Sequence, residues 1–159
     1  MLLQGKNVVV YGAGGAVGSA VARAFADEGA RVFLTARTLD VVDTVAKEIT
    51  VAGGAAETDV VDAGDEKAVT DHLAAVVAAG SVDVSFNAIG ISPRDLQGIP
   101  LTELPVENFL RPITTYTRAH FVTAKSAARH MIAQRSGVIM MNTPEPARLP
   151  LPLVGGMSV

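Results

Sequence analysis

The run Asn7–Gly12 constrains the fold of this chain more than any other stretch of its sequence. Its β-branched residues are continuous and do not alternate with polar ones, which is typical of a strand buried on both faces of a parallel sheet. Four glycines follow within residues 12–18, and apolar residues then recur at helical spacing as far as Gly29. A buried strand, a glycine-rich turn and a helix in this order predict the first half of a βαβ unit.

The same alternation of strand and helix patterns continues along the chain. Strands are expected at residues 31–37, 55–60, 82–90 and 137–143, and helices at 16–30, 39–54, 65–80 and about 106–134. Such alternation predicts right-handed crossovers and a parallel sheet. We therefore predict a doubly wound, Rossmann-type α/β fold that forms one domain over residues 1–159. Its five strands take the order 3-2-1-4-5 between two helical layers, with the cofactor at their carboxyl ends.

Three helical features carry further expectations. Asp65 stands at the start of the third helix as its N-cap. Pro112 lies inside the long helical region, where it removes a backbone donor, so we expect a break or a kink there. His72 follows Asp71 in the third helix and is expected on its surface.

Composition narrows the possible functions. The formal net charge is −3, so no basic field favours a nucleic-acid partner. Cysteine is absent and the histidines have no acidic partners at metal spacing, so we expect no metal site. No apolar run approaches the roughly 20 residues that a membrane helix needs. We expect a cytoplasmic protein without a membrane partner.

The glycine-rich turn predicts a dinucleotide site. Glycines allow a tight turn, let a pyrophosphate approach the backbone and let the helix pack close to the strand. The helix that follows supplies free N–H groups and the positive end of its dipole to the phosphates. The alternative is that these glycines only turn the chain. The predicted contacts from this loop are Gly12, Gly14, Gly15, Ala16, Val17 and Gly18.

The end of the second strand bears on which dinucleotide binds. Folds that prefer NAD usually place an acidic residue there for the ribose hydroxyls, but this chain has Ala36 and then Arg37. An arginine can pair with a 2′-phosphate, so we predict NADP(H) in preference to NAD(H). The missing acid also argues against a methyltransferase. Arg37 could instead be a solvated surface charge, and nearby Asp40 weakens the preference for NADP(H).

With these motifs the whole chain resembles the short-chain dehydrogenase/reductase family. Its opening glycine element is similar to the family's, with Tyr11 in place of the usual threonine and Ala16 in place of the middle glycine. The resemblance implies that Asp59 and Val60 contact the adenine. Residues 86–90, FNAIG, resemble the family's NNAG element, which supports the sheet and lies along the cofactor ribose. The matching residues there are Asn87 and Ala88, followed by Gly90.

At all four positions of the family's catalytic pattern the chain departs from the pattern or has no residue. Members use Asn, Ser, Tyr and Lys, with the tyrosine as general acid. Counting along the chain places the asparagine position at Tyr116 and the serine position at Pro144, directly after Thr143. The tyrosine position falls at Met157, and the lysine position falls beyond Val159. Tyr116 and Thr143 are therefore the candidate catalytic residues.

Two polar residues at the end of the last predicted strand each have an alternative interpretation. Thr143 could simply cap the end of a strand. Glu145 could act as an acid or base, but we expect it to be a solvated loop carboxylate.

Two functions remain open at this stage. The first is an NADP(H)-linked oxidoreductase that acts on a carbonyl or an alcohol with an atypical active site. The second is a dinucleotide-binding or scaffold domain that keeps the fold without the chemistry. The helix at 106–134 carries two apolar faces, and the resemblance implies that it packs against a second copy in a homo-oligomer. One face contains Phe109, Ile113, Tyr116, His120, Ala124, Ala127 and Met131, and the other contains Phe121, Ala128 and Ile132.

Overall fold

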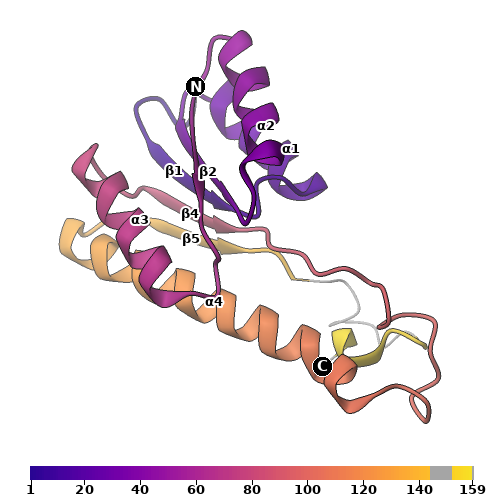
Figure 1. The fold of residues 1–159 in the computed structure, drawn as a ribbon. Helices are drawn as coiled ribbons and strands as arrows, with labels where there is room; N and C mark the ends of the chain where they lie inside the picture. Colours follow the sequence, from indigo (N-terminus) through magenta and orange to yellow (C-terminus); the bar gives the residue numbers. More distant parts are fainter. Residues whose placement is uncertain (144–151, 159) are drawn as a thin grey trace.

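The computed structural model describes residues 1–143 and 152–158, and it contains one parallel sheet of five strands in the order β3-β2-β1-β4-β5. This is the predicted order. Helices α1 and α2 cover one face of the sheet and α3 and α4 cover the other (Figure 1). The strands are β1 (Asn7–Tyr11), β2 (Arg31–Ala36), β3 (Ala55–Val60), β4 (Val84–Asn87) and β5 (Val138–Met141). The helices are α1 (Ala16–Asp27), α2 (Leu39–Val51), α3 (Glu66–Ala78), α4 (Val106–Gln134) and the 3₁₀ helix η2 (Gly155–Ser158).

Strand β1 lies at the centre of the sheet and divides the core into two layers. Val8 and Val10 pack toward α1 and α2, whereas Val9 and Tyr11 pack toward α3 and α4. All four side chains are fully buried. The continuous apolar run is therefore explained, because neither face of a central parallel strand meets water.

Helix α4 continues through Pro112, so of the break or kink that the sequence suggested, the break is wrong. The proline removes one backbone bond in the second turn, but its ring is buried and gains packing. A Cβ added at Gly156 of η2 would lie 3.2 Å from Pro112 Cγ, which shows how closely the two segments meet. Tertiary packing outweighs the local preference here.

The buried side of α4 differs in part from the predicted one. Ala127 and Met131 are buried as expected, but Tyr116 and His120 are only half-buried. Small residues occupy the side that faces the sheet, where they let α4 approach it closely. These buried residues include Ala119, Thr123 and Ser126.

His72 is buried, which corrects the expectation that it lies on the surface. Its side chain is 7% exposed, and its ring lies edge-on to the rings of Tyr11 and Phe33 at centroid distances of 6.4 and 6.5 Å. Val69, His72, Leu73 and Val76 form the inner side of α3 at helical spacing, and that spacing decides burial more than the neighbouring Asp71 does. Asp65 caps this helix as predicted, accepting bonds from Lys67 N and Ala68 N.

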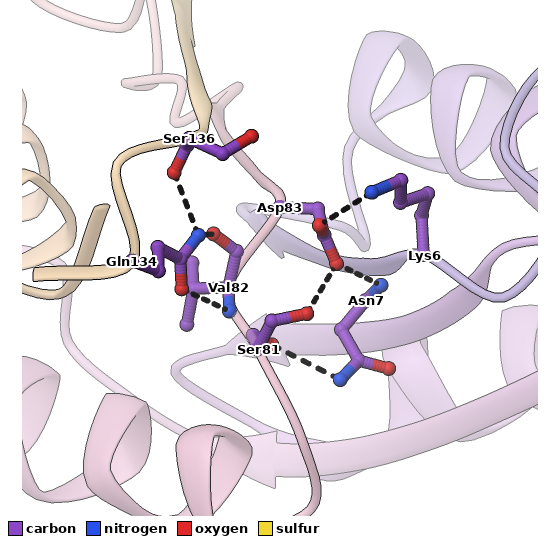
Figure 2. A network of polar contacts seen from close by, with 7 residues as sticks. All are labelled: Lys6, Asn7, Ser81, Val82, Asp83, Gln134 and Ser136. Atoms are coloured by element: carbon purple, nitrogen blue, oxygen red, sulfur yellow. Dashed lines mark hydrogen bonds and ion pairs between the residues drawn. The ribbon is translucent and has the colours of Figure 1, made fainter. Parts of the chain in front are cut away.

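A polar network at the amino-terminal edge of the sheet joins β1 to β4 (Figure 2). The Asp83 carboxylate accepts bonds from Lys6 Nζ at 3.0 Å, Asn7 N at 3.0 Å and Ser81 Oγ at 2.5 Å. Desolvation acts to raise the pKa of Asp83, but these three donors outweigh it and hold the pKa below its ordinary value. In the same figure Gln134, at the end of α4, donates to the carbonyls of Val82 and Ser136.

The network yields a first prediction. Asp83→Ala leaves Asn7 N and Ser81 Oγ without their acceptor, so we expect it to lower the free energy of unfolding by about 2 kcal/mol. Asp71→Ala is a matched control, because Asp71 also pairs with a lysine but on the exposed surface of α3. We expect the control to change stability by less than about 0.5 kcal/mol. Urea unfolding of the three proteins at pH 7 measures both effects.

The pH dependence of that difference tests its cause. The folded protein holds the Asp83 carboxylate at a lower pKa than the unfolded chain does, so the stabilisation is complete above the ordinary aspartate value of about 4. It is lost as the pH falls through the lower, folded value. The stability gap between the original protein and Asp83→Ala should therefore narrow below about pH 4. A gap that stays constant down to pH 2 would mean that the carboxylate charge is not its source.

Candidate functional site

Gly12 turns the chain where β1 ends, and the turn brings three strands together. Its φ of +75° lies in the left-handed region, and its N–H and that of Ala13 both donate to Thr35 O of β2, at 2.9 and 3.0 Å. A Cβ at position 12 would lie 2.9 Å from Ala88 O, just past the end of β4. Glycine is therefore required both by the backbone conformation and by the close approach of β4.

The other glycines of the loop have different reasons to be there. A Cβ at Gly18 would lie 2.3 Å from Gly12 O, so only glycine lets α1 pack this close to the turn. A Cβ at Gly14 would lie 2.8 Å from Val41 Cβ in α2. Gly15 has only an ordinary contact, 3.4 Å from Gly12 O. Packing thus explains three of the glycines, whereas Gly15 is exposed and no close contact there excludes a Cβ.

The first turn of α1 is exposed to solvent. Gly15 is its N-cap and supplies no side-chain acceptor, and the first turn has no acidic residue. Gly15, Ala16 and Val17 are all exposed. The N–H groups of a helix start carry partial positive charge and need acceptors. This end of α1 can therefore accept an anionic group such as a phosphate.

Arg37 follows β2 directly and is exposed. Within residues 1–143 and 152–158 its guanidinium takes part in no ion pair. The contact of Gly14 with Val41 shows that the start of α2 lies against the glycine loop, so Arg37 is close to that loop in space. Thr38 begins α2 without a side-chain cap, and Asp40 stands in its first turn.

The end of β3 is aligned with the end of β2. Val61 N donates to Ala36 O at 2.9 Å, which places the Asp59–Val60 pair at the same edge of the sheet as Arg37. Both residues of the pair are exposed. The Asp59 carboxylate accepts a bond from Val60 N at 2.7 Å.

Asn87 ends β4 and is buried, and its side-chain amide joins β4 to α4 and to the loop that follows β4. Its Nδ2 donates to Ala119 O at 3.2 Å and to Thr123 Oγ1 at 3.0 Å in α4. Its Oδ1 accepts a bond from Ile89 N at 3.1 Å, and its carbonyl accepts one from Asn142 N past β5. Ala88 is buried against the glycine loop, whereas a Cβ at Gly90 would meet nothing within 4 Å.

The two candidate catalytic residues come from different elements. Tyr116 is half-buried in α4, and its ring centroid lies 5.9 Å from that of His120. Burial lowers the pKa of His120, whose Nε2 is buried without a partner. Thr143 is exposed just past β5. In the described part of the chain no hydrogen bond joins Thr143 to Tyr116.

The remaining positions of the family pattern are only partly visible. Pro144 and Glu145 lie outside the described residues. Met157 lies in η2, where its sulfur accepts a bond from Gln97 Nε2 at 3.3 Å. Met157 is thus held by the loop that follows β4.

Some residues of this region escaped the sequence analysis. Thr35 anchors the glycine turn through its carbonyl, and Val41 packs against Gly14, but a carbonyl or a valine has no distinguishing sequence signal. Tyr11 was noted only as a departure from the family pattern. Its ring is fully buried, its hydroxyl has no partner among the described residues, and burial raises the pKa of the phenol.

Two classes of site find no support in the described residues. Residues 1–143 and 152–158 hold no group of three or more acidic, histidine or cysteine side chains that could bind a metal ion. Among the helices built from those residues, none has the length and apolarity to cross a membrane.

Comparison with known proteins agrees with the fold and the loop. The family model for short chain dehydrogenases matches residues 6–152. L-rhamnose 1-dehydrogenase (NAD(P)(+)) of Azotobacter vinelandii is 38% identical over 149 residues, which cover 88% of this chain and 56% of that protein. Gluconate 5-dehydrogenase of Gluconobacter oxydans is 32% identical over 139 residues, covering 87% of this chain and 53% of the relative.

Solved structures give the same result. A metagenomic short-chain oxidoreductase in complex with NADP superimposes with a TM-score of 0.84 at 31% identity, covering 99% of this chain and 70% of that one. An NAD⁺-bound xylitol dehydrogenase superimposes with a TM-score of 0.89 at 27% identity, covering 99% of this chain and 61% of that one. This chain therefore belongs to the short-chain dehydrogenase family, a family of oxidoreductases. It spans about half the length of the curated relatives that it matches.

Proposed function

We propose that this chain provides the NADP(H)-binding part of an oxidoreductase that acts on a carbonyl or an alcohol. The observation that carries the proposal is the start of α1, which has no side-chain cap and directly follows the glycine loop that lies against α2. When bound, the nicotinamide cofactor supplies or accepts a hydride. The chain's own residues bind and orient that cofactor.

Each part of the dinucleotide has a candidate partner at this edge of the sheet. The exposed N–H groups at the start of α1 suit the pyrophosphate, because they are free donors at the positive end of a helix dipole. Arg37 suits a 2′-phosphate, because a guanidinium forms paired bonds with phosphate oxygens. The exposed Asp59 and Val60 suit the adenine. Ala88 and Gly90 border the ribose in this arrangement, and Asn87 supports them from behind.

Tyr116 and Thr143 are our candidates for the residues that meet the substrate. Each carries a hydroxyl, and a hydroxyl can donate a hydrogen bond to a carbonyl oxygen on which negative charge develops. Thr143 stands at the carboxyl end of β5, and Tyr116 lies one turn of α4 before Ala119, whose carbonyl accepts a bond from Asn87. Both therefore lie near the carboxyl ends of the strands, where the cofactor is proposed to bind.

Direct titration tests the proposal. We expect NADPH to bind at least about tenfold more tightly than NADH, a difference of roughly 1.4 kcal/mol. A screen of carbonyl and alcohol substrates, beginning with L-rhamnose, gluconate and xylitol, then tests for turnover. NADPH binding without turnover on any substrate would favour a dinucleotide-binding domain without chemistry. Failure to bind either nucleotide would contradict the proposal.

We propose in addition that the outer face of α4 takes part in self-association. Phe121 and Ile132 are 65% and 75% exposed on that face, and large apolar side chains that are exposed together often mark an interface. Sedimentation of the protein with Phe121→Glu should show a shift toward the monomer. A cytoplasmic location stays a prediction of the sequence, which cell fractionation can test.

A further inference from the structure

A hollow lies between the outer strand β3 and helix α3, and it shares only Asp59 with the proposed dinucleotide site. It is a cavity of about 130 Å³. Glu57 and Asp59 line it from β3, and they share one face of that strand because they are two residues apart. Phe33 of β2 and Val76 of α3 form apolar walls, and His72 lines it from α3. Since a water molecule occupies about 30 Å³ of liquid, the cavity has room for a small organic group.

His72 is the buried polar group of this cavity. The side chain is 7% exposed, and its Nδ1 is buried and has no hydrogen-bond partner among the described residues. Desolvation lowers the pKa of His72, although Asp59 and Glu57 act in the opposite direction. The imidazole is therefore neutral at pH 7 and carries one acceptor nitrogen. In the tautomer protonated on Nε2, Nδ1 is a buried acceptor without a donor, and a ligand with N–H groups would satisfy it.

The charges around the cavity favour a cation. Glu57 and Asp59 both contribute a carboxylate, and no lysine or arginine is among the lining residues. The nearest balancing charge is Arg31, which pairs with Glu57 and lies over the Phe33 ring, 5.2 Å from its centroid. That single cation leaves the surroundings of His72 with a net negative charge. The apolar walls are suited to methylene groups.

We propose that this cavity binds a short primary alkylammonium ion. The ammonium group lies among Glu57, Asp59 and His72, to which it donates hydrogen bonds, and the alkyl chain packs against Phe33 and Val76. An inorganic cation would make no use of the apolar walls, and an anion would be repelled by the two carboxylates. The proposal does not rest on the proposed cofactor site: Asp59 is common to both, but Arg37 and the glycine loop do not line this cavity.

The test uses n-propylammonium chloride as the probe, titrated into the full chain at pH 7 and constant ionic strength. Protein NMR follows the His72 ring and the backbone amides of β3 and α3. We expect saturable shifts with a dissociation constant in the millimolar range, roughly 1–10 mM. We also expect the pKa of His72, measured by a pH titration of its ring signals, to fall when the probe is bound. The positive charge of the bound ammonium disfavours the imidazolium. The titratable groups that face this ring are Glu57 and Asp59 on β3 and Tyr11 on β1.

Two variants and one control distinguish a specific binding site from attraction to the overall negative charge of the protein. Glu57→Gln should weaken binding about fivefold, the effect of one carboxylate some 4 Å away in water. Glu48→Gln is the matched control, because Glu48 pairs with Arg23 on the other face of the sheet with the same exposure of 50%. It should leave binding unchanged. His72→Phe keeps an aromatic ring while it removes the acceptor, and it should also weaken binding.

Three results would overturn the assignment. The first is a set of shifts that stays linear in probe concentration up to about 100 mM. The second is an equal response to 1-propanol, which has the same chain without the charge. The third is equal weakening by Glu57→Gln and Glu48→Gln, which would show attraction to the overall negative charge only. NADPH titration of the same variants shows separately whether the cofactor site is intact.

Discussion

Replacing Gly18 with alanine is expected to destabilise the protein by about 2 kcal/mol and to abolish NADPH binding. An exposed glycine inside a helix would normally give the opposite result, because alanine stabilises a helix interior by about 1 kcal/mol. At position 18 the added Cβ would lie 2.3 Å from Gly12 O, which is backbone and cannot rotate away. Relief requires α1 to move away from β1, and overpacking of this kind costs about 1–3 kcal/mol.

The same movement explains the loss of the cofactor. The first turn of α1 would shift away from the glycine loop, and its N–H groups would no longer point to one position for a pyrophosphate. Thermal unfolding should show a fall of about 4–8 °C for a protein of this size. Calorimetric titration with NADPH measures the loss of binding at a temperature where the variant is still folded.

Gly15→Ala is the control for this prediction. A Cβ at Gly15 has only one ordinary contact, and the φ of −77° suits any residue. We expect stability to change by less than about 1 kcal/mol, since alanine is a slightly poorer N-cap than glycine. NADPH affinity should nevertheless fall, because the new methyl group would stand where the phosphate approaches. If Gly18→Ala proved more stable than the original protein, the close contact with Gly12 would be contradicted.

Replacing Arg37 with alanine is expected to weaken NADPH binding by about thirtyfold and to leave NADH binding within about twofold. A hydrogen bond to a charged group contributes about 1.5–3 kcal/mol, and thirtyfold corresponds to about 2 kcal/mol. NADH lacks the 2′-phosphate, so it has nothing at this position to lose. Arg37 is exposed and makes no ion pair in the described residues, so its removal should not affect folding.

Arg129→Ala serves as the control for the Arg37 experiment. It removes the same charge from α4, on the other side of the sheet, where its ion pair with Glu66 is long at 3.9 Å. We expect both nucleotides to bind this variant as they bind the original protein. Equal weakening of NADPH by the two variants would show that overall charge, and not contact with a phosphate, sets the preference.

The sequence predicted the sheet well because several signals agreed. The strand order follows from alternating strands and helices with right-handed crossovers, and it was confirmed. The need for glycine at positions 12 and 18 was also predicted, since a tight turn and close helix packing both exclude a Cβ. Asp65 was recognised as an N-cap because its position before an apolar period is a local signal.

Features that depend on tertiary packing were predicted poorly. His72 was assigned to the surface on account of its acidic neighbour, whereas its spacing with Val69 and Val76 places it in the core. Pro112 was expected to break or kink α4, but the helix continues through it and the residue is buried near η2. The place of Asn87 beside the cofactor stays a prediction, and the bonds of its side-chain amide to α4 had no signal in the sequence. No periodicity in a single sequence reveals these long-range partners.

The exposure of strand β5 is another feature that the local sequence pattern did not predict. Val138, Ile139, Met140 and Met141 are 38–51% exposed, although an apolar run like theirs is typical of a buried strand. The sequence analysis expected a strand near residues 137–143, and the pairing of β5 with β4 confirms it. Only one neighbouring strand covers its edge in the described part of the chain. Burial therefore depends on contacts that the local pattern cannot show.

Chemical-shift mapping with NADP⁺ tests the central claim most directly. We predict that the backbone amides of residues 13–18, Arg37, Val60 and Gly90 respond together and saturate at one concentration, because one dinucleotide would touch all of them. The amides of the Asp83 network at the opposite edge of the sheet should not respond. Shifts confined to another surface, or loop amides that stay unchanged at saturating NADP⁺, would contradict the assignment of this edge as the cofactor site.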